Sequence, residues 1–131
     1  MKQKQIPYIP IAQIFSYFHQ EAQAVFLDSS LQNEKGKYSI IGLNPYLTIE
    51  NREALYINDV KSNQSFYAYI KQYLKENYKP NPTNLPIVSG AIGYFSYDFG
   101  RKQNQVSSRH KDTYKIPSCI LNFYDNFIIE D

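Results

Sequence analysis

The chain has 131 residues and a formal net charge of +2 at neutral pH. This is the length of one domain, and the charge excludes a global field that would attract nucleic acid or an anionic membrane. No apolar run approaches the ~18 residues of a membrane span. The single cysteine, Cys119, cannot form an intramolecular disulfide, so we expect a cytoplasmic protein.

The first half of the chain reads as a helix followed by three strands. An amphipathic helix is predicted over residues 11–20, with Ile11, Ile14, Phe15 and Phe18 as its buried stripe. The alternation in "AVFLDSS" predicts a short strand that ends at residues 28–30. The segments "KYSIIGLNPYLTIEN" and "EALYINDV" predict two strands that turn at Asn51 and Arg52, with a bulge, bend or edge position at Pro45.

The second half contains a helix and two further strands. The segment "SNQSFYAYIKQYLKENYK" predicts a helix capped by Ser62 or Asn63, whose buried face consists of Phe66, Ile70, Tyr73, Leu74 and Asn77. A proline-rich linker, "PNPTNLP", leads to a strand in "SGAIGYFSYDFGRK". A polar loop then precedes one long strand, "SCILNFYDNFIIED", with Cys119, Leu121 and Phe123 on one face.

This order of elements favours an α+β fold with a mostly antiparallel β-sheet or sandwich and two or so helices, in a single domain over residues 1–131. Thirteen tyrosines and eight phenylalanines agree with a sheet-rich protein. Two bare glycines, Gly90 and Gly93, stand among four aromatic rings. Because glycine weakens a strand, we expect another part of the backbone to approach closely there.

Motifs for catalysis are scarce. The tripeptide "DFG" at residues 98–100 lacks every other element of a kinase, so we interpret it as a strand end with Gly100 in a turn. No cluster of cysteine and histidine has the spacing of metal ligands. The segment "GAIGYFSYDF" loosely resembles an RNA-binding strand with stacking aromatics, which leaves a small RNA-binding module as an alternative. The net charge provides no general attraction to nucleic acid, so we do not expect it as a partner.

Four segments taken in order resemble the N-terminal region of the chorismate-utilising synthases: "VFLDSS", "KYSIIGLNPYLTIE", "VSGAIGYFSYDFGRK" and "IPSCILNFYDNFIIED". The first three are similar to the family patterns L-L-E-S, R-Y-S-x-x-G-x-x-P and G-G-x-x-G-Y-x-x-Y-D. The continuation "YDFGRK" and the short connection from Val60 to Val88 favour aminodeoxychorismate synthase component I, the para-aminobenzoate synthase of folate biosynthesis. The alternative is the same region of anthranilate synthase component I, of tryptophan biosynthesis.

The resemblance implies a non-catalytic regulatory and scaffolding part. The family's catalytic and magnesium-binding residues lie in a C-terminal domain that this chain lacks, so no catalytic residue, metal site or cofactor is expected here. The expected partners are that domain and a glutamine amidotransferase component II, which supplies ammonia. Strands left without their cover, over residues 118–130 or 89–99, also suggest a homodimer.

The family also implies a ligand pocket, because some members hold a tryptophan against the L-L-E-S strand as a feedback inhibitor or a fixed structural ligand. By position, this pocket carries over to Leu27, Asp28 and Ser29, with Asp28 in place of the motif's glutamate. A plain core role remains an alternative for these residues. The structural motif of the glycine-rich strand consists of Gly90, Gly93, Tyr94, Tyr97 and Asp98, with the two tyrosines flanking the close contact.

Overall fold

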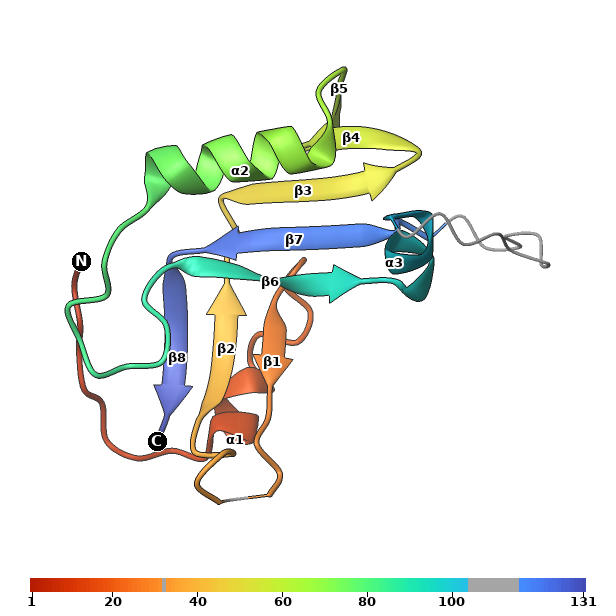
Figure 1. Ribbon diagram of the computed structural model, residues 1–131. Coiled ribbons are helices and arrows are strands. Elements are labelled where there is room, and N and C mark those ends of the chain that lie inside the picture. The colour runs from red at the N-terminus through yellow and green to blue at the C-terminus, as the bar shows by residue number, and fades with distance from the viewer. Residues whose placement is uncertain (32, 104–115) are drawn as a thin grey trace.

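The computed structural model describes residues 1–31, 33–103 and 116–131. Most of the predicted polar loop therefore lies outside the described residues. Two antiparallel sheets run in nearly perpendicular directions, and α1 and α2 accompany one sheet each (Figure 1). This arrangement confirms the expected α+β fold with antiparallel sheets.

The larger sheet has the strand order β5-β4-β3-β7-β6. Its strands are β3 (Leu47–Arg52), β4 (Ala54–Ile57), β5 (Val60–Ser62), β6 (Gly90–Phe95) and β7 (Cys119–Tyr124). The smaller sheet has the order β1-β2-β8 and contains β1 (Val25–Leu27), β2 (Ser39–Leu43) and β8 (Asn126–Glu130). The described helices are α1 (Ile11–Phe15), α2 (Phe66–Asn77) and α3 (Tyr97–Gln103).

Two short connections join the sheets. Asn44, in the left-handed region at φ 51°, and Pro45 turn the chain from β2 into β3, so the bend expected at the proline is confirmed. The predicted single strand over "SCILNFYDNFIIED" is wrong, because Asp125 separates β7 from β8 and the two strands belong to different sheets.

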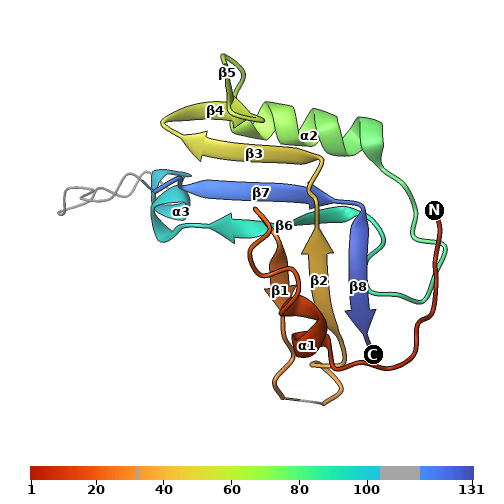
Figure 2. The same cartoon turned by 180° about the vertical axis from the view of Figure 1, so that it is seen from behind.

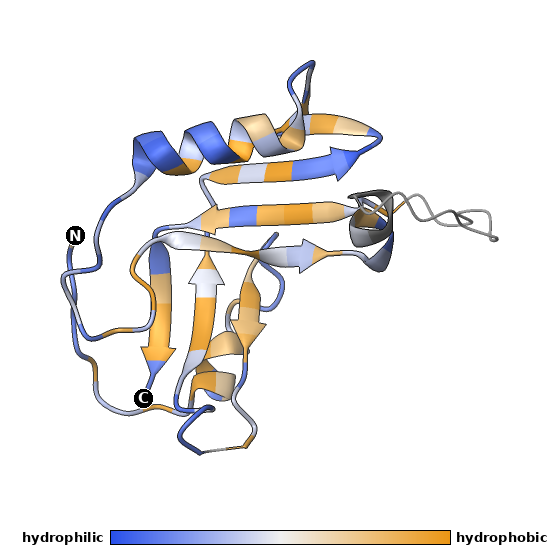
Figure 3. Ribbon diagram, in the orientation of Figure 1, coloured by the Kyte–Doolittle hydropathy of each residue, from blue (hydrophilic) through white to orange (hydrophobic). Residues whose placement is uncertain are grey.

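Each sheet has its own hydrophobic core. One core lies between α2 and the larger sheet and consists of Leu47, Ile49, Leu55, Phe66, Phe99, Cys119 and Phe123. The other lies between α1 and the smaller sheet, on the side that faces the viewer in Figure 2, and consists of Ile11, Ile41 and Leu43. Figure 3 shows apolar residues along β7, the strand that lies between β3 and β6. The prediction that Cys119, Leu121 and Phe123 share a face is confirmed, since all three contact the first core.

The helices begin and end differently from the predictions. Helix α2 is capped by Ser65, whose hydroxyl accepts a hydrogen bond from the Ala68 N–H at 3.1 Å, rather than by Ser62 or Asn63. Ser62 is the last residue of β5, which delays the start of the helix. Leu74 and Asn77 were predicted on the buried face, but Leu74 is 52% exposed and Asn77 is exposed as well.

Helix α1 is half the expected length. The Ser16 hydroxyl donates to the Gln13 carbonyl oxygen at 2.6 Å, and turns replace the helix after Phe15. Such local side-chain bonds compete with the helical pattern. Phe18 nevertheless packs against the second core, as the apolar stripe predicts.

The segment "EALYINDV" was predicted as one strand, but it contains β4 and the first residue of β5. Asn58 and Asp59 adopt left-handed backbone angles, with φ 48° and 65°, and form the two-residue turn between β4 and β5. The preceding turn is made by Glu53, at φ 61°, rather than by Asn51 and Arg52, which belong to β3. Asn and Asp tolerate left-handed backbone angles better than most residues, whereas Glu53 adopts them as the single residue between β3 and β4.

Cys119 makes the fold less stable at alkaline pH. Burial raises the pKa of this thiol to about 11, above the value of about 8.5 for an unfolded chain. The folded state therefore holds the proton more tightly, and its contribution to stability is complete below about pH 8.5 and is lost as the pH rises toward 11. We expect urea unfolding to show a smaller alkaline loss in Cys119→Ala than in the original chain. Equal losses in the two proteins would contradict a raised thiol pKa.

Candidate functional site

Ser39 organises a polar network where β1 ends beside β2. Its hydroxyl donates to the Asp28 carboxylate at 3.0 Å and accepts from the Ser29 backbone N–H, also at 3.0 Å. The Ser29 hydroxyl donates to the Tyr38 carbonyl oxygen at 2.5 Å. Ser39 itself is only 7% exposed, so its hydroxyl has to find its partners within the protein. The network thus fixes the predicted pocket segment against β2.

The network leaves acceptor groups at a partly open surface. The Ser29 hydroxyl gives its proton to a carbonyl and keeps lone pairs that can accept, and the exposed Asp28 contributes a negative charge. Leu27, one residue earlier, is 46% exposed and provides an apolar contact. This arrangement can bind a ligand that carries an ammonium or another positively charged group next to an apolar group. Sequence reasoning named Leu27, Asp28 and Ser29 but missed Ser39, whose role becomes visible only when β1 pairs with β2.

Near the Ser39 network, Lys37 supplies a positive charge two residues before β2 begins. Its ammonium lies 3.5 Å from an Asp131 carboxylate oxygen and 5.0 Å from the centre of the Tyr38 ring. A hydrogen bond with Tyr38 and the charge of Asp131 raise the pKa of Lys37. Both side chains of the ion pair are more than half exposed, so the pair adds little stability.

The glycine-rich segment forms β6, the edge strand of the larger sheet, and pairs with β7. A Cβ at Gly93 would overlap the backbone carbonyl of Ile120, in the neighbouring strand. At Gly90 a Cβ would meet only the flexible Ile87 side chain, at 3.1 Å. The close approach expected at the glycines therefore exists at Gly93, and it comes from the adjacent strand of the same sheet rather than from a facing one.

The residues after the glycines separate in space. The Tyr94 hydroxyl donates to the Pro117 carbonyl oxygen at 3.0 Å, whereas Tyr97 is 87% exposed. The interpretation of "DFG" as a strand end is wrong, because Asp98 lies in the first turn of α3 and Gly100 lies within this helix. The Ser96 hydroxyl accepts from the Phe99 N–H at 3.2 Å, which explains why a helix begins here.

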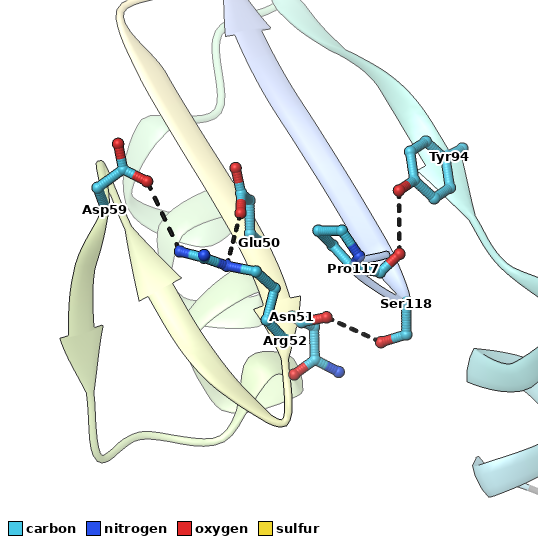
Figure 4. A network of polar contacts seen from close by, with 7 residues as sticks. All are labelled: Glu50, Asn51, Arg52, Asp59, Tyr94, Pro117 and Ser118. Atoms are coloured by element: carbon cyan, nitrogen blue, oxygen red, sulfur yellow. Dashed lines mark hydrogen bonds and ion pairs between the residues drawn. The ribbon is translucent and has the colours of Figure 1, made fainter. Parts of the chain in front are cut away.

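A second polar cluster lies on the larger sheet and was missed from the sequence (Figure 4). The Arg52 guanidinium forms ion pairs with the Glu50 carboxylate at 2.9 Å and the Asp59 carboxylate at 3.6 Å. Its central carbon lies 4.1 Å from the centre of the Tyr56 ring. The alternate positions of Glu50 and Arg52 in one strand were the available signal. One guanidinium faces two carboxylates, so the cluster keeps a net negative charge. The Arg52–Glu50 pair joins two positions of β3, whereas the pair with Asp59, a side chain that is 88% exposed, adds little stability.

Tyr94 lies across β7 from this cluster. Burial raises the pKa of its hydroxyl, and the Glu50 carboxylate raises it further. Tyr94 pairs with Ile120 and Ile92 with Asn122, which places both β6 side chains on the same face, while Phe95 lies on the other. An RNA-binding strand needs aromatic platforms at alternate positions of one face, so this geometry does not favour the RNA-binding alternative.

The described part of the chain contains neither a cluster of candidate metal ligands nor a helix that could span a membrane. No group of three or more His, Cys, Asp or Glu side chains within it is placed to hold a metal ion. No helix within it is long and apolar enough to cross a membrane.

Several known proteins are similar to this chain in sequence or fold. No family model matches the chain. Anthranilate synthase component 1 of Acetivibrio thermocellus is 30% identical over 128 residues, which cover 90% of this chain and 26% of that protein. The Bacillus subtilis (strain 168) protein of the same name is 35% identical over 93 residues, covering 65% of this chain and 18% of the relative. The chain thus spans about a quarter or less of the length of these relatives.

A solved structure has the same fold. The crystal structure of anthranilate synthase component I from Streptococcus pneumoniae TIGR4 matches 98% of this chain and 29% of its own with a TM-score of 0.61, at 19% identity. The chain belongs to the chorismate-utilising family. Within this family, the two relatives and the solved structure are anthranilate synthases, the class that the sequence analysis placed second. They do not support its preference for aminodeoxychorismate synthase.

Gly93 offers a test of the close strand contact. We expect Gly93→Ala to destabilise the fold by about 3 kcal/mol or more, since the rigid backbone of Ile120 must move to accept a methyl group. Gly100→Ala is the matched control, because no atom lies within 4 Å of its added Cβ and alanine favours helix. Thermal melting of both variants would decide, and equal melting temperatures would contradict the strand contact.

Proposed function

We propose that residues 1–131 form a non-catalytic domain of a component I synthase of the anthranilate type, which binds a small amino acid ligand and supports the catalytic part. The observation that carries this proposal is the Ser39 network, which holds Asp28 and Ser29 at the partly open end of β1. The names and the partial coverage of the relatives support the assignment to component I.

In this proposal the complete synthase adds ammonia to chorismate with loss of the hydroxyl as water, then eliminates the enolpyruvyl side chain as pyruvate and releases anthranilate. Ammonia would come from a glutamine amidotransferase component II, and magnesium would bind in the catalytic part. Aminodeoxychorismate synthase remains the second candidate because Tyr97–Arg101 matches the Y-D-x-G-R pattern. Replacement of the chorismate 4-hydroxyl by an amino group would then be the reaction.

The proposed ligand is tryptophan, with its ammonium at the Ser29 hydroxyl and the Asp28 carboxylate and its indole against Leu27 and neighbouring apolar groups. A charged ammonium needs charged or polar acceptors to offset its lost hydration, and Asp28 and Ser29 supply them. The indole would cover apolar surface that is now partly exposed at Leu27.

Tryptophan binding can be tested on these 131 residues. We expect calorimetric titration to show binding and the ligand to raise the melting temperature. Ser29→Ala should weaken binding about tenfold, as expected for one lost hydrogen bond to a charged group. Ser30→Ala is the control, because Ser30 is exposed and adjacent to the network. Melting of the free variants shows whether each folds.

The result also separates the two synthase classes. Tryptophan that exchanges freely with solution would favour feedback regulation in an anthranilate synthase, whereas tryptophan that remains bound through dialysis would favour a fixed structural ligand. No heat and no shift in melting temperature would reject the pocket in this chain.

The absence of catalysis is a separate prediction. We expect the chain alone, supplied with ammonium and magnesium, to leave chorismate unconsumed when the reaction is followed by absorbance. Buffer without protein is the control for spontaneous decay. Chorismate turnover that survives repurification would contradict a non-catalytic domain.

A further inference from the structure

Strand β6 presents an unprotected sheet edge. Within the described part of the chain it pairs with β7 alone. Its six residues, "GAIGYF", contain no charge and no proline. Ala91 and Gly93 are exposed, and Tyr94 and Phe95 are 40% and 56% exposed. Natural proteins normally protect such an edge, because its free N–H and C=O groups accept another strand.

The other three outer strands are protected. β5 is three residues long and carries Lys61 in its centre. β1 is also three residues long and is followed at once by the charged Asp28. β8 lines a cleft of about 600 Å³ together with the N-terminal segment, and Glu130, the last residue of β8, raises the pKa of Tyr8 in that segment. Among the outer strands of the two described sheets, β6 is therefore the one whose edge is left unprotected.

We propose that β6 pairs antiparallel with β6 of a second copy of this chain, forming a two-fold dimer with a continuous sheet. A second copy fits because an uncharged strand meets no repulsion from its own image, and a two-fold axis normal to the sheet closes the assembly after two copies. The same expectation from the sequence also included the strands over residues 118–130. The structure favours β6, because β7 is flanked by β3 and β6 within its sheet.

Side-chain sizes along β6 suit one register. A two-fold axis normal to the sheet places a residue opposite its own copy, and centring it on Gly93 places Phe95 opposite Ala91 of the second copy. Ile92 then lies opposite Tyr94 on the other face, an aromatic pair with a β-branched residue that stabilises sheets. Large residues thus meet small or flat ones. One strand pair is small beside the ~1,600 Å² of a standard interface, so we expect affinity on the order of micromolar.

The test is sedimentation velocity over a micromolar concentration series, with Ala91→Lys as the blocking variant. The original chain should form a dimer, and Ala91→Lys should be at least tenfold weaker in association. Val60→Lys, on the exposed outer strand β5 of the same sheet, is the matched control and should still dimerise. Circular dichroism of the dilute variants verifies that both fold.

Hydrogen exchange locates the contact independently of these variants. Amides of residues 90–95 should gain protection as the concentration rises, while those of β5 should not change. A monomer at all concentrations would overturn the proposal, and so would a dimer unaffected by Ala91→Lys. Protection at β6 that appears only on addition of a separately made synthase catalytic domain would assign the edge to that domain instead. None of these outcomes depends on tryptophan binding, so the two proposals can fail separately.

Discussion

The position of Tyr124 at the corner between the two sheets is the constraint on which the rest of the structure depends. Its side chain is 1% exposed, and its hydroxyl donates at 2.6 Å to the carbonyl oxygen of Gln23, 101 residues earlier in the chain. The ring lies against Gly42, where a Cβ would approach the ring carbons to 3.1 Å. One side chain at the end of β7 therefore connects the approach to β1 and the middle of β2. Burial raises the pKa of Tyr124, so the neutral hydroxyl needed for this bond is favoured.

The candidate pocket depends on that corner through strand register. Phe26 pairs with Ile41 and Leu27 with Ile40, so the residues that follow β1 lie beside Ser39. A shift of one residue would move every side chain of β1 to the opposite face and separate Asp28 and Ser29 from the Ser39 hydroxyl. The hydroxyl of Tyr124 limits such a shift, because it holds Gln23 just before the strand. The hydrogen bond between Tyr124 and Gln23 thus helps to position the polar groups of the site, although none of those groups takes part in it.

The sequence predicted local features better than long-range ones. Alternation and proline placement led to the antiparallel α+β fold and to the bend at Pro45. The corner at Asp125 could not be predicted in the same way, because the apolar alternation continues across it as it would in a straight strand. Ser96 is a typical helix-capping residue and could have predicted α3, but the "DFG" tripeptide was interpreted as a strand end. Ser39 showed no signal at all, since its role requires β1 to lie next to it.

The chemistry of the described residues explains why a holding role suits them better than a reactive one. The Ser39 network consists of a carboxylate, two hydroxyls, a backbone N–H and a carbonyl, and both hydroxyls already donate their protons to neighbouring oxygens. A nucleophile needs a nearby base or a lowered pKa, whereas burial raises the pKa of Cys119. Arg52, which could stabilise a developing negative charge, is bound by Glu50 and Asp59. Groups that satisfy one another in this way can orient a bound molecule without reorganising, which is the property that the proposed ligand-binding role requires.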